Sequence, residues 1–199
     1  MGLDISAYKV DRIPPNEIPP EVEPWNDAYN DWQEERGRQN LPWALFIGPN
    51  VNPGGGYWDD HIGGLEPGWY QEAFDEQHSF RAGSYSGHNE FRNQLAKAAG
   101  YGRGAESAWD LETPYGPPFM ELINFSDAEG LIGPTISQKL YSDFIDHEDK
   151  VMNTVDQWYL KMVPGQEWDL QEVRWFKRLY EDWKEAFRIA SDNGIVSFH

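Results

Sequence analysis

The most regular hydrophobic pattern in the chain lies near its C-terminal end and predicts a long amphipathic helix over residues 170–192. Apolar side chains recur there every three or four positions, which gathers them on one helical face. Asp169 is placed to cap this helix, and Asn193 and Gly194 end it. Residues 195–199 begin with two β-branched side chains and predict a final strand.

The rest of the chain carries shorter segments of the same two kinds. Strands are predicted over residues 3–10, 41–47, 78–82 and 119–125, and helices over 25–38, 87–99, 133–144 and 148–162. Residues 69–74 are predicted as a short helix or turn, and 101–118 as irregular. This mixture predicts an α+β fold class in a single domain over 1–199. The domain would have a small, mostly antiparallel sheet with helices packed on one side, and the long C-terminal helix would be followed by a terminal strand.

Two segments interrupt these patterns. Residues 10–24 hold five prolines, which exclude a helix interior or a central strand and predict an extended connector on the surface. Residues 48–68 are rich in glycine and proline and predict a long loop. A loop of this length inside a compact domain is usually functional or mobile.

Composition and charge narrow the classes of function. The 199 residues carry 16 basic and 34 acidic side chains, a net charge of -18, which disfavours direct binding to nucleic acid or to anionic membranes. The absence of cysteine excludes disulfides, thiolate metal sites and thiol catalysis. Ten Trp, ten Tyr and ten Phe still allow a sizeable core. We expect a protein of the reducing cytoplasm, with no cofactor and no membrane attachment.

The first candidate site lies where the strand predicted at 78–82 gives way to the helix predicted at 87–99. A bend punctuated by glycine exposes backbone N–H groups there, at the positive end of the helix dipole. Arginine and hydroxyl donors surround the bend and suit a phosphate or carboxylate, and a tyrosine is available to stack on a ring. The candidate binding residues are Arg81, Ser84, Tyr85, Ser86 and Asn89, with Arg92 as a further cation. The alternative is structural, with the same residues forming a helix cap, a turn and an ion pair.

The second candidate site follows the apolar segment 119–125. Asn124, Ser126, Asp127 and Glu129 stand at its end, where loops commonly build sites. Asp127 and Glu129 suit an acid/base pair or one hard metal ion, although a turn cap and a solvated side chain would explain them equally. His199 would line the same cleft if the last strand is central to the sheet, and would otherwise be an exposed tail.

Four short blocks carry a resemblance to a known family. They are Met1-Gly2-Leu3-Asp4-Ile5, residues 80–87 (FRAGSYSG), residues 121–130 (ELINFSDAEG) and residues 196–199 (VSFH). These blocks resemble a family of uncharacterised proteins encoded by tailed bacteriophages and by bacterial genomes, often in prophages. The resemblance implies an intracellular setting, the host cytoplasm if the chain is phage-encoded. It also implies that the matching blocks form one site, and it brings no activity with it.

Three functions follow from these candidates. The first is a phage-type accessory protein that binds a small phosphorylated or nucleotide-like ligand between the two sites, with counter-defence as its role. The second is an inhibitor whose acidic faces imitate nucleic acid and bind a basic host protein. The third is a hydrolase in which Asp127 or Glu129 acts with His88 or His199 as acid and base.

Overall fold

The computed structural model describes residues 2–48, 63–111, 116–125, 130–161 and 167–199. Its fold is α+β, as predicted, with a five-stranded antiparallel sheet among the described residues. The strands run in the order β2-β3-β1-β5-β4 across the sheet. Their bounds are β1 Leu3–Arg12, β2 Ala44–Ile47, β3 Gly68–Gly83, β4 Gly130–Ile132 and β5 Gly194–Phe198.

Strand β1 is the central strand of the sheet. Its two neighbours, β3 and β5, come from distant parts of the chain. β3 pairs with β1 from Gly83 back to Tyr70, and β5 pairs with its first half. Leu3, Ile5 and Ala7 of β1 are fully buried, while the intervening positions are only partly buried. This alternation is the period-2 pattern of a strand that faces a core on one side, and it confirms the strand predicted at 3–10.

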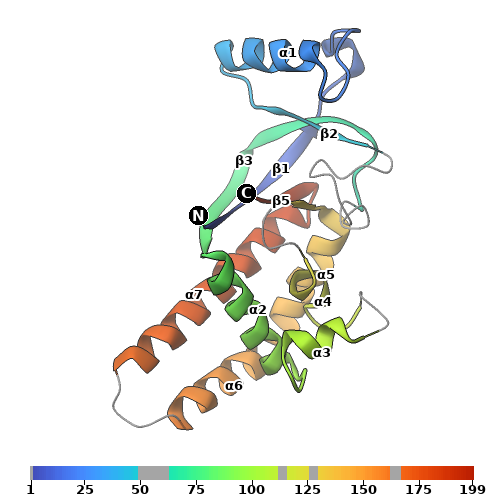
Figure 1. Ribbon diagram of the computed structural model, residues 1–199. Coiled ribbons are helices and arrows are strands. Elements are labelled where there is room, and N and C mark those ends of the chain that lie inside the picture. Colours follow the sequence, from blue (N-terminus) through green and yellow to red (C-terminus); the bar gives the residue numbers. More distant parts are fainter. Residues whose placement is uncertain (1, 49–62, 112–115, 126–129, 162–166) are drawn as a thin grey trace.

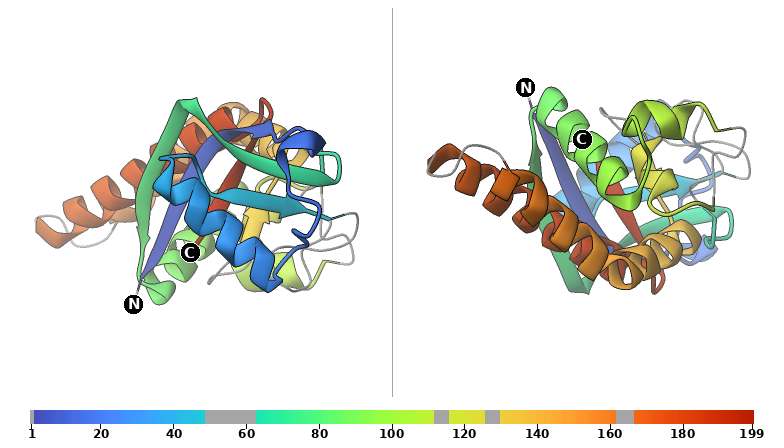
Figure 2. Two further views of the ribbon diagram at one scale, coloured as in Figure 1. Left: turned by 90° about the horizontal axis from the view of Figure 1, so that it is seen from above. Right: turned by 90° about the horizontal axis from the view of Figure 1, so that it is seen from below.

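Among the described residues, the six helices α2 to α7 gather at one side of the sheet (Figure 1). The longest, α7, supplies the buried stripe that the sequence predicted, including Phe176, Tyr180, Trp183 and Phe187. Seen from below, α7 lies across the sheet with α2 beside it (Figure 2). The bounds are α2 Tyr85–Ala99, α3 Ala105–Trp109, α4 Met120–Ile123, α5 Pro134–Asp146, α6 Glu148–Lys161 and α7 Glu167–Ala190.

The remaining helix, α1 (Asp27–Arg38), stands apart at the other end of the molecule, over β2 and β3 (Figures 1 and 2). Asn26 caps it by accepting a hydrogen bond from the Tyr29 N–H at 2.7 Å. The predicted connector starts later than expected, because β1 continues to Arg12, and it contains a short 3-10 turn, η1 (Pro15–Glu17). Most of the loop predicted at 48–68 lies outside the described residues.

Two predicted elements are of the wrong type, and the segment predicted to be irregular at 101–118 contains helix α3, Ala105–Trp109. Residues 69–74 belong to the long strand β3 rather than to a short helix or turn. Trp69 and Tyr70 are buried in two different hydrophobic clusters, so both faces of this segment are partly covered. The segment therefore lacks the alternation of apolar and polar residues that marks a half-exposed strand. Residues 119–125 contain the helical turn α4, Met120–Ile123, rather than a strand. Their continuous apolar run reflects burial in the main core and not the type of element.

Candidate ligand-binding site

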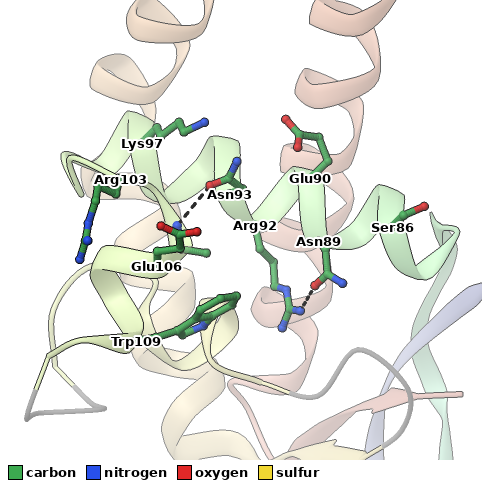
Figure 3. Close-up of a pocket in the computed structure, with 10 residues that line it drawn as sticks. Ser86, Asn89, Glu90, Arg92, Asn93, Lys97, Arg103, Glu106 and Trp109 are labelled. Atoms are coloured by element: carbon green, nitrogen blue, oxygen red, sulfur yellow. Dashed lines mark hydrogen bonds between the residues drawn. The ribbon is translucent and has the colours of Figure 1, made fainter.

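A pocket of about 510 Å³ opens between helix α2 and the segment that leads into α3 (Figure 3). Its walls are polar, with both charge signs and one large aromatic ring. The lining residues are Ser86, Asn89, Glu90, Arg92, Asn93, Lys97, Arg103, Ala105, Glu106 and Trp109.

Helix α2 provides one wall because its sequence separates a polar stripe from an apolar one. Ser86, Asn89, Asn93 and Lys97 recur every three or four residues and so share a face. Phe91 and the apolar positions after it are buried on the opposite side. The helix is well defined at both ends. The Ser84 hydroxyl accepts a hydrogen bond from the Gly87 N–H at 3.1 Å, and Gly100 ends the helix in a left-handed conformation.

The opposite wall approaches α2 closely because residue 104 is a glycine. Gly104 has a φ of +69°, and a Cβ at this position would overlap the Asn93 side-chain oxygen. That same oxygen accepts a hydrogen bond from the Ala105 N–H at 3.3 Å. Asn93 therefore fixes the start of α3 against α2 and sets the width of the pocket.

The floor of the pocket is the buried guanidinium of Arg92, which is 6% exposed. Its Nη1 donates to the Ile123 carbonyl at 3.3 Å and to the Phe125 carbonyl, and its Nη2 donates to the Asn89 side-chain oxygen. The end of α4 is thereby tied to α2. Charge-assisted hydrogen bonds of this kind are about twice as strong as neutral ones, so Arg92 holds the two candidate segments together.

Charge in the pocket is mixed but leans positive, in contrast to the whole chain. Arg92, Lys97 and Arg103 face Glu90 and Glu106. Within the described part of the chain, Lys97 takes part in no ion pair, whereas Arg103 pairs with Asp110 at the rim. Both partners of that rim pair are about two-thirds exposed, so solvent screens their attraction. An anion in the pocket can therefore compete for Arg103.

Trp109 completes the pocket with an aromatic surface. Its side chain is 59% exposed at the end of α3, an unusual position for so large a ring. In the close-up it lies beside Glu106 and opposite the α2 wall (Figure 3). An indole in this position offers a stacking surface to a planar ligand group, in a pocket whose lining also includes cations.

The structure places the first group of predicted residues partly in this pocket. Ser86 and Asn89 line it, while Ser84 is the cap of α2. Tyr85 is 38% exposed in the first turn of the same helix and is not among the lining residues. Arg81 lies outside the pocket, because its side chain, 59% exposed, pairs with Asp4 of the neighbouring strand at 3.3 Å.

The second group is only partly described. Asn124 ends α4, next to the carbonyls that Arg92 binds, and its buried side-chain oxygen accepts no hydrogen bond from any described residue. Ser126, Asp127 and Glu129 lie outside the described residues. His199 follows β5, which is flanked by β1 and β4, and its backbone exchanges two hydrogen bonds with Asp4. The residue is exposed and does not line the pocket.

Sequence reasoning missed seven of the ten lining residues: Asn93, Lys97, Glu90, Arg103, Ala105, Glu106 and Trp109. The first two could have been found from the polar stripe that runs along α2. Arg103 and Trp109 gave no comparable signal, because they lie in a segment predicted to be irregular. They reach the pocket only through the bend at Gly104.

A second polar cluster packs beside this region and has a structural explanation. Lys139 contacts the buried Glu121 at 2.5 Å and Asp143 at 2.7 Å, and the Phe119 N–H donates to Asp143 at 2.7 Å. Burial raises the pKa of Asp143, and it raises the pKa of nearby Tyr101 to about 12, with the two carboxylates adding to the effect on the tyrosine. These contacts hold Phe119 in a left-handed conformation with a φ of +58°. The cluster therefore fixes the turn before α4.

Two kinds of feature are absent from the described residues. No group of three or more His, Cys, Asp or Glu residues there is placed to hold a metal ion. No helix within the described ranges has the length and apolar character needed to cross a membrane.

In comparisons with protein-family models, with curated proteins and with solved structures, nothing matches this chain significantly.

Proposed function

We propose that this protein binds a small phosphorylated, nucleotide-like ligand in the pocket between α2 and α3. The observation that carries the proposal is a concave site with three cations and an exposed indole in a chain of net charge -18. A protein with 16 basic residues has few cations to place, and three of them line one hollow. Cations next to an aromatic face suit a ligand that joins an anion to a planar ring.

Different lining residues would contact different parts of such a ligand. Lys97 and Arg103 bind the phosphate, and Arg103 exchanges its contact with Asp110 for the ligand's oxygens. Trp109 stacks on the base. Glu90 and Glu106 accept hydrogen bonds from ribose hydroxyls or a base amine, because ionised carboxylates act only as acceptors. Arg92 positions Asn89 and closes the floor.

The cellular role that we propose is sequestration of a nucleotide signal in counter-defence. This role is supported by the resemblance of the four sequence blocks to phage and prophage proteins. A protein with this role would act in the host cytoplasm. Binding alone satisfies this role, because removing a signal from solution requires affinity and not turnover.

The experiment is isothermal titration calorimetry of the protein with AMP, ATP, a cyclic dinucleotide and inorganic phosphate. At least one nucleotide is expected to bind more tightly than phosphate alone, since only the nucleotide uses Trp109. Arg103→Ala should weaken that binding about tenfold or more, the loss of one charge-assisted contact. Arg38→Ala is the control, because Arg38 is similarly exposed and is also ion-paired, in its case to Glu34 and Glu35 of α1.

A second pair of variants tests the aromatic contact. Trp109→Ala should weaken nucleotide binding about fivefold or more and leave phosphate binding unchanged. Trp25→Ala, which removes an indole of similar exposure on the far side of the molecule, should change neither. The proposal is wrong if none of the four compounds binds, or if the Arg38 and Trp25 variants lose as much affinity as the pocket variants.

A further inference from the structure

The end of the molecule that carries α1 presents aromatic and apolar side chains to solvent. Trp43 is 66% exposed, Trp25 57% and Leu41 44%. Both indoles are held by the buried Tyr29: Trp43 Nε1 donates to the Tyr29 hydroxyl at 3.1 Å, and Trp25 meets the Tyr29 ring edge-on at a centroid distance of 5.4 Å. Exposed aromatic side chains on a rigid support are typical of binding surfaces.

The same end is strongly acidic. Residues 13–35 contain seven carboxylates and no Lys, Arg or His. Five of these side chains are exposed and form no ion pair with any residue that the structure describes. One of them, Glu17, acts on the charge of the buried Arg36, and the other four are Glu21, Glu23, Asp27 and Asp31. We call these four carboxylates together with Trp25, Leu41 and Trp43 the α1 patch. Its charge and its indoles both attract cations.

The aromatic cluster beneath the α1 patch already binds one guanidinium. Arg36 lies over the Trp32 ring at 5.1 Å from its centroid and also donates to the Pro42 carbonyl at 2.9 Å. Arg36 is buried, and this burial lowers its pKa. The faces of Trp25 and Trp43 offer the same chemistry outward.

We propose that the α1 patch docks a segment of a partner protein that is rich in Lys and Arg. Charge complementarity selects this partner over the other possible occupants. A second copy of this chain would bring a net charge of -18 against the patch, and a nucleic acid would bring phosphates. The proposal is independent of the pocket, because none of the patch residues lines it.

The test measures binding of a fluorescein-labelled octapeptide of alternating arginine and glycine by fluorescence anisotropy, with a serine–glycine octapeptide as the neutral reference. Trp43→Ala and Trp25→Ala should each weaken binding of the arginine peptide about fivefold, the size of an exposed cation–π contact. These variants leave the net charge unchanged, so a loss of affinity isolates the aromatic contribution. Trp109→Ala is the control in the pocket and should bind the arginine peptide as the unmodified protein does.

A second comparison separates the patch from the general negative charge of the protein. Glu23→Gln combined with Asp31→Asn should weaken peptide binding more than Glu90→Gln combined with Glu106→Gln, although both pairs remove two charges. Equal losses from the two pairs, or no loss from the Trp43 and Trp25 variants, would overturn the proposal. Sedimentation that shows self-association abolished by Trp43→Ala would also overturn it, because a second copy would then be the occupant.

Discussion

The α1 patch and the α2–α3 pocket both expose indoles, yet they differ in shape, charge and internal support. The pocket is concave and lined by Lys97 and Arg103, whereas the α1 patch includes four exposed carboxylates. Beneath the α1 patch, Tyr29 stacks on Trp69 with ring centroids 5.5 Å apart. The pocket is supported instead by the buried polar contacts of Arg92.

This difference shows how an acidic protein can offer two kinds of binding surface. A net charge of -18 makes any region without local cations attractive to a basic partner. A site for an anion must instead bring several cationic side chains together and separate them from the negative charge of the rest of the chain. A concave pocket meets both requirements. The two regions should therefore respond differently to mutations that remove aromatic packing and to those that remove polar contacts.

The largest effect is expected from Trp69→Ala, which removes the ring at the centre of the aromatic support. Trp69 is 8% exposed and contacts Tyr29, Trp32 and Phe46. The free energy of unfolding should fall by about 4 kcal/mol in urea denaturation, the usual loss for a buried aromatic. Hydrogen exchange should rise in α1 and stay low in α2. Equal acceleration in both helices would contradict separate support for the two regions.

Arg92→Ala should break the pocket's support and leave the α1 end intact. It removes the hydrogen bonds to the Ile123 and Phe125 carbonyls and to Asn89, so buried acceptors lose a charged donor. We expect a loss of about 3 kcal/mol in the free energy of unfolding. Arg38→Ala, which removes an exposed ion-paired arginine from α1, should change stability by less than about 0.5 kcal/mol. Comparable losses from both variants would refute the assigned role of Arg92.

Gly104→Ala should alter only the approach of α3 to α2. The new Cβ would overlap the Asn93 side chain, and an alanine at a φ of +69° is strained. Unfolding in urea should show a loss of about 2 kcal/mol, accompanied by weaker nucleotide binding. Gly102→Ala is the control, since nothing lies within 4 Å of the position that its new methyl group would take. A Gly104 variant with unchanged stability and binding would mean that this turn does not set the pocket.

The smallest expected effect is on the pH dependence of stability, and it comes from the polar cluster around Asp143. Burial raises the pKa of this carboxyl above its ordinary value of 3.8, so the folded state holds the proton more tightly than the unfolded state. The contribution of the Asp143 carboxyl to the free energy of unfolding is present in full below pH 3.8, and it is lost as the pH rises through the raised pKa of the folded state. Asp143→Asn should flatten that decline, measured by unfolding at a series of pH values. Asp146→Asn, which changes an exposed carboxylate on the same helix, should leave the slope as it is.

The sequence predicted the elements whose signals are local. The apolar stripe of α7 and the alternation of β1 are both present. The turn at Phe119 could not be predicted, because it depends on a hydrogen bond to Asp143, which is 24 residues away in the chain. The strand at 69–74 was missed because contacts on both of its faces removed the alternation.

The candidate site was predictable only as far as helix α2. The order of Ser86, Asn89 and Arg92 along a helix follows from local spacing, and these residues do line the pocket. Arg81 was predicted to be a cationic donor beside the bend, but a neighbouring strand supplies Asp4 as its partner. Trp109 carried no local signal, since its place depends on the packing of one bend against α2.

The most direct test of ligand binding in the α2–α3 pocket is a crystal structure of the protein with the nucleotide that binds most tightly. We predict a phosphate within about 3 Å of the Lys97 and Arg103 nitrogens, which is ordinary hydrogen-bond reach, and a base over the Trp109 ring. A nucleotide bound elsewhere, for example beside Arg81 and Asp4, with the α2–α3 pocket unchanged, would contradict this binding mode.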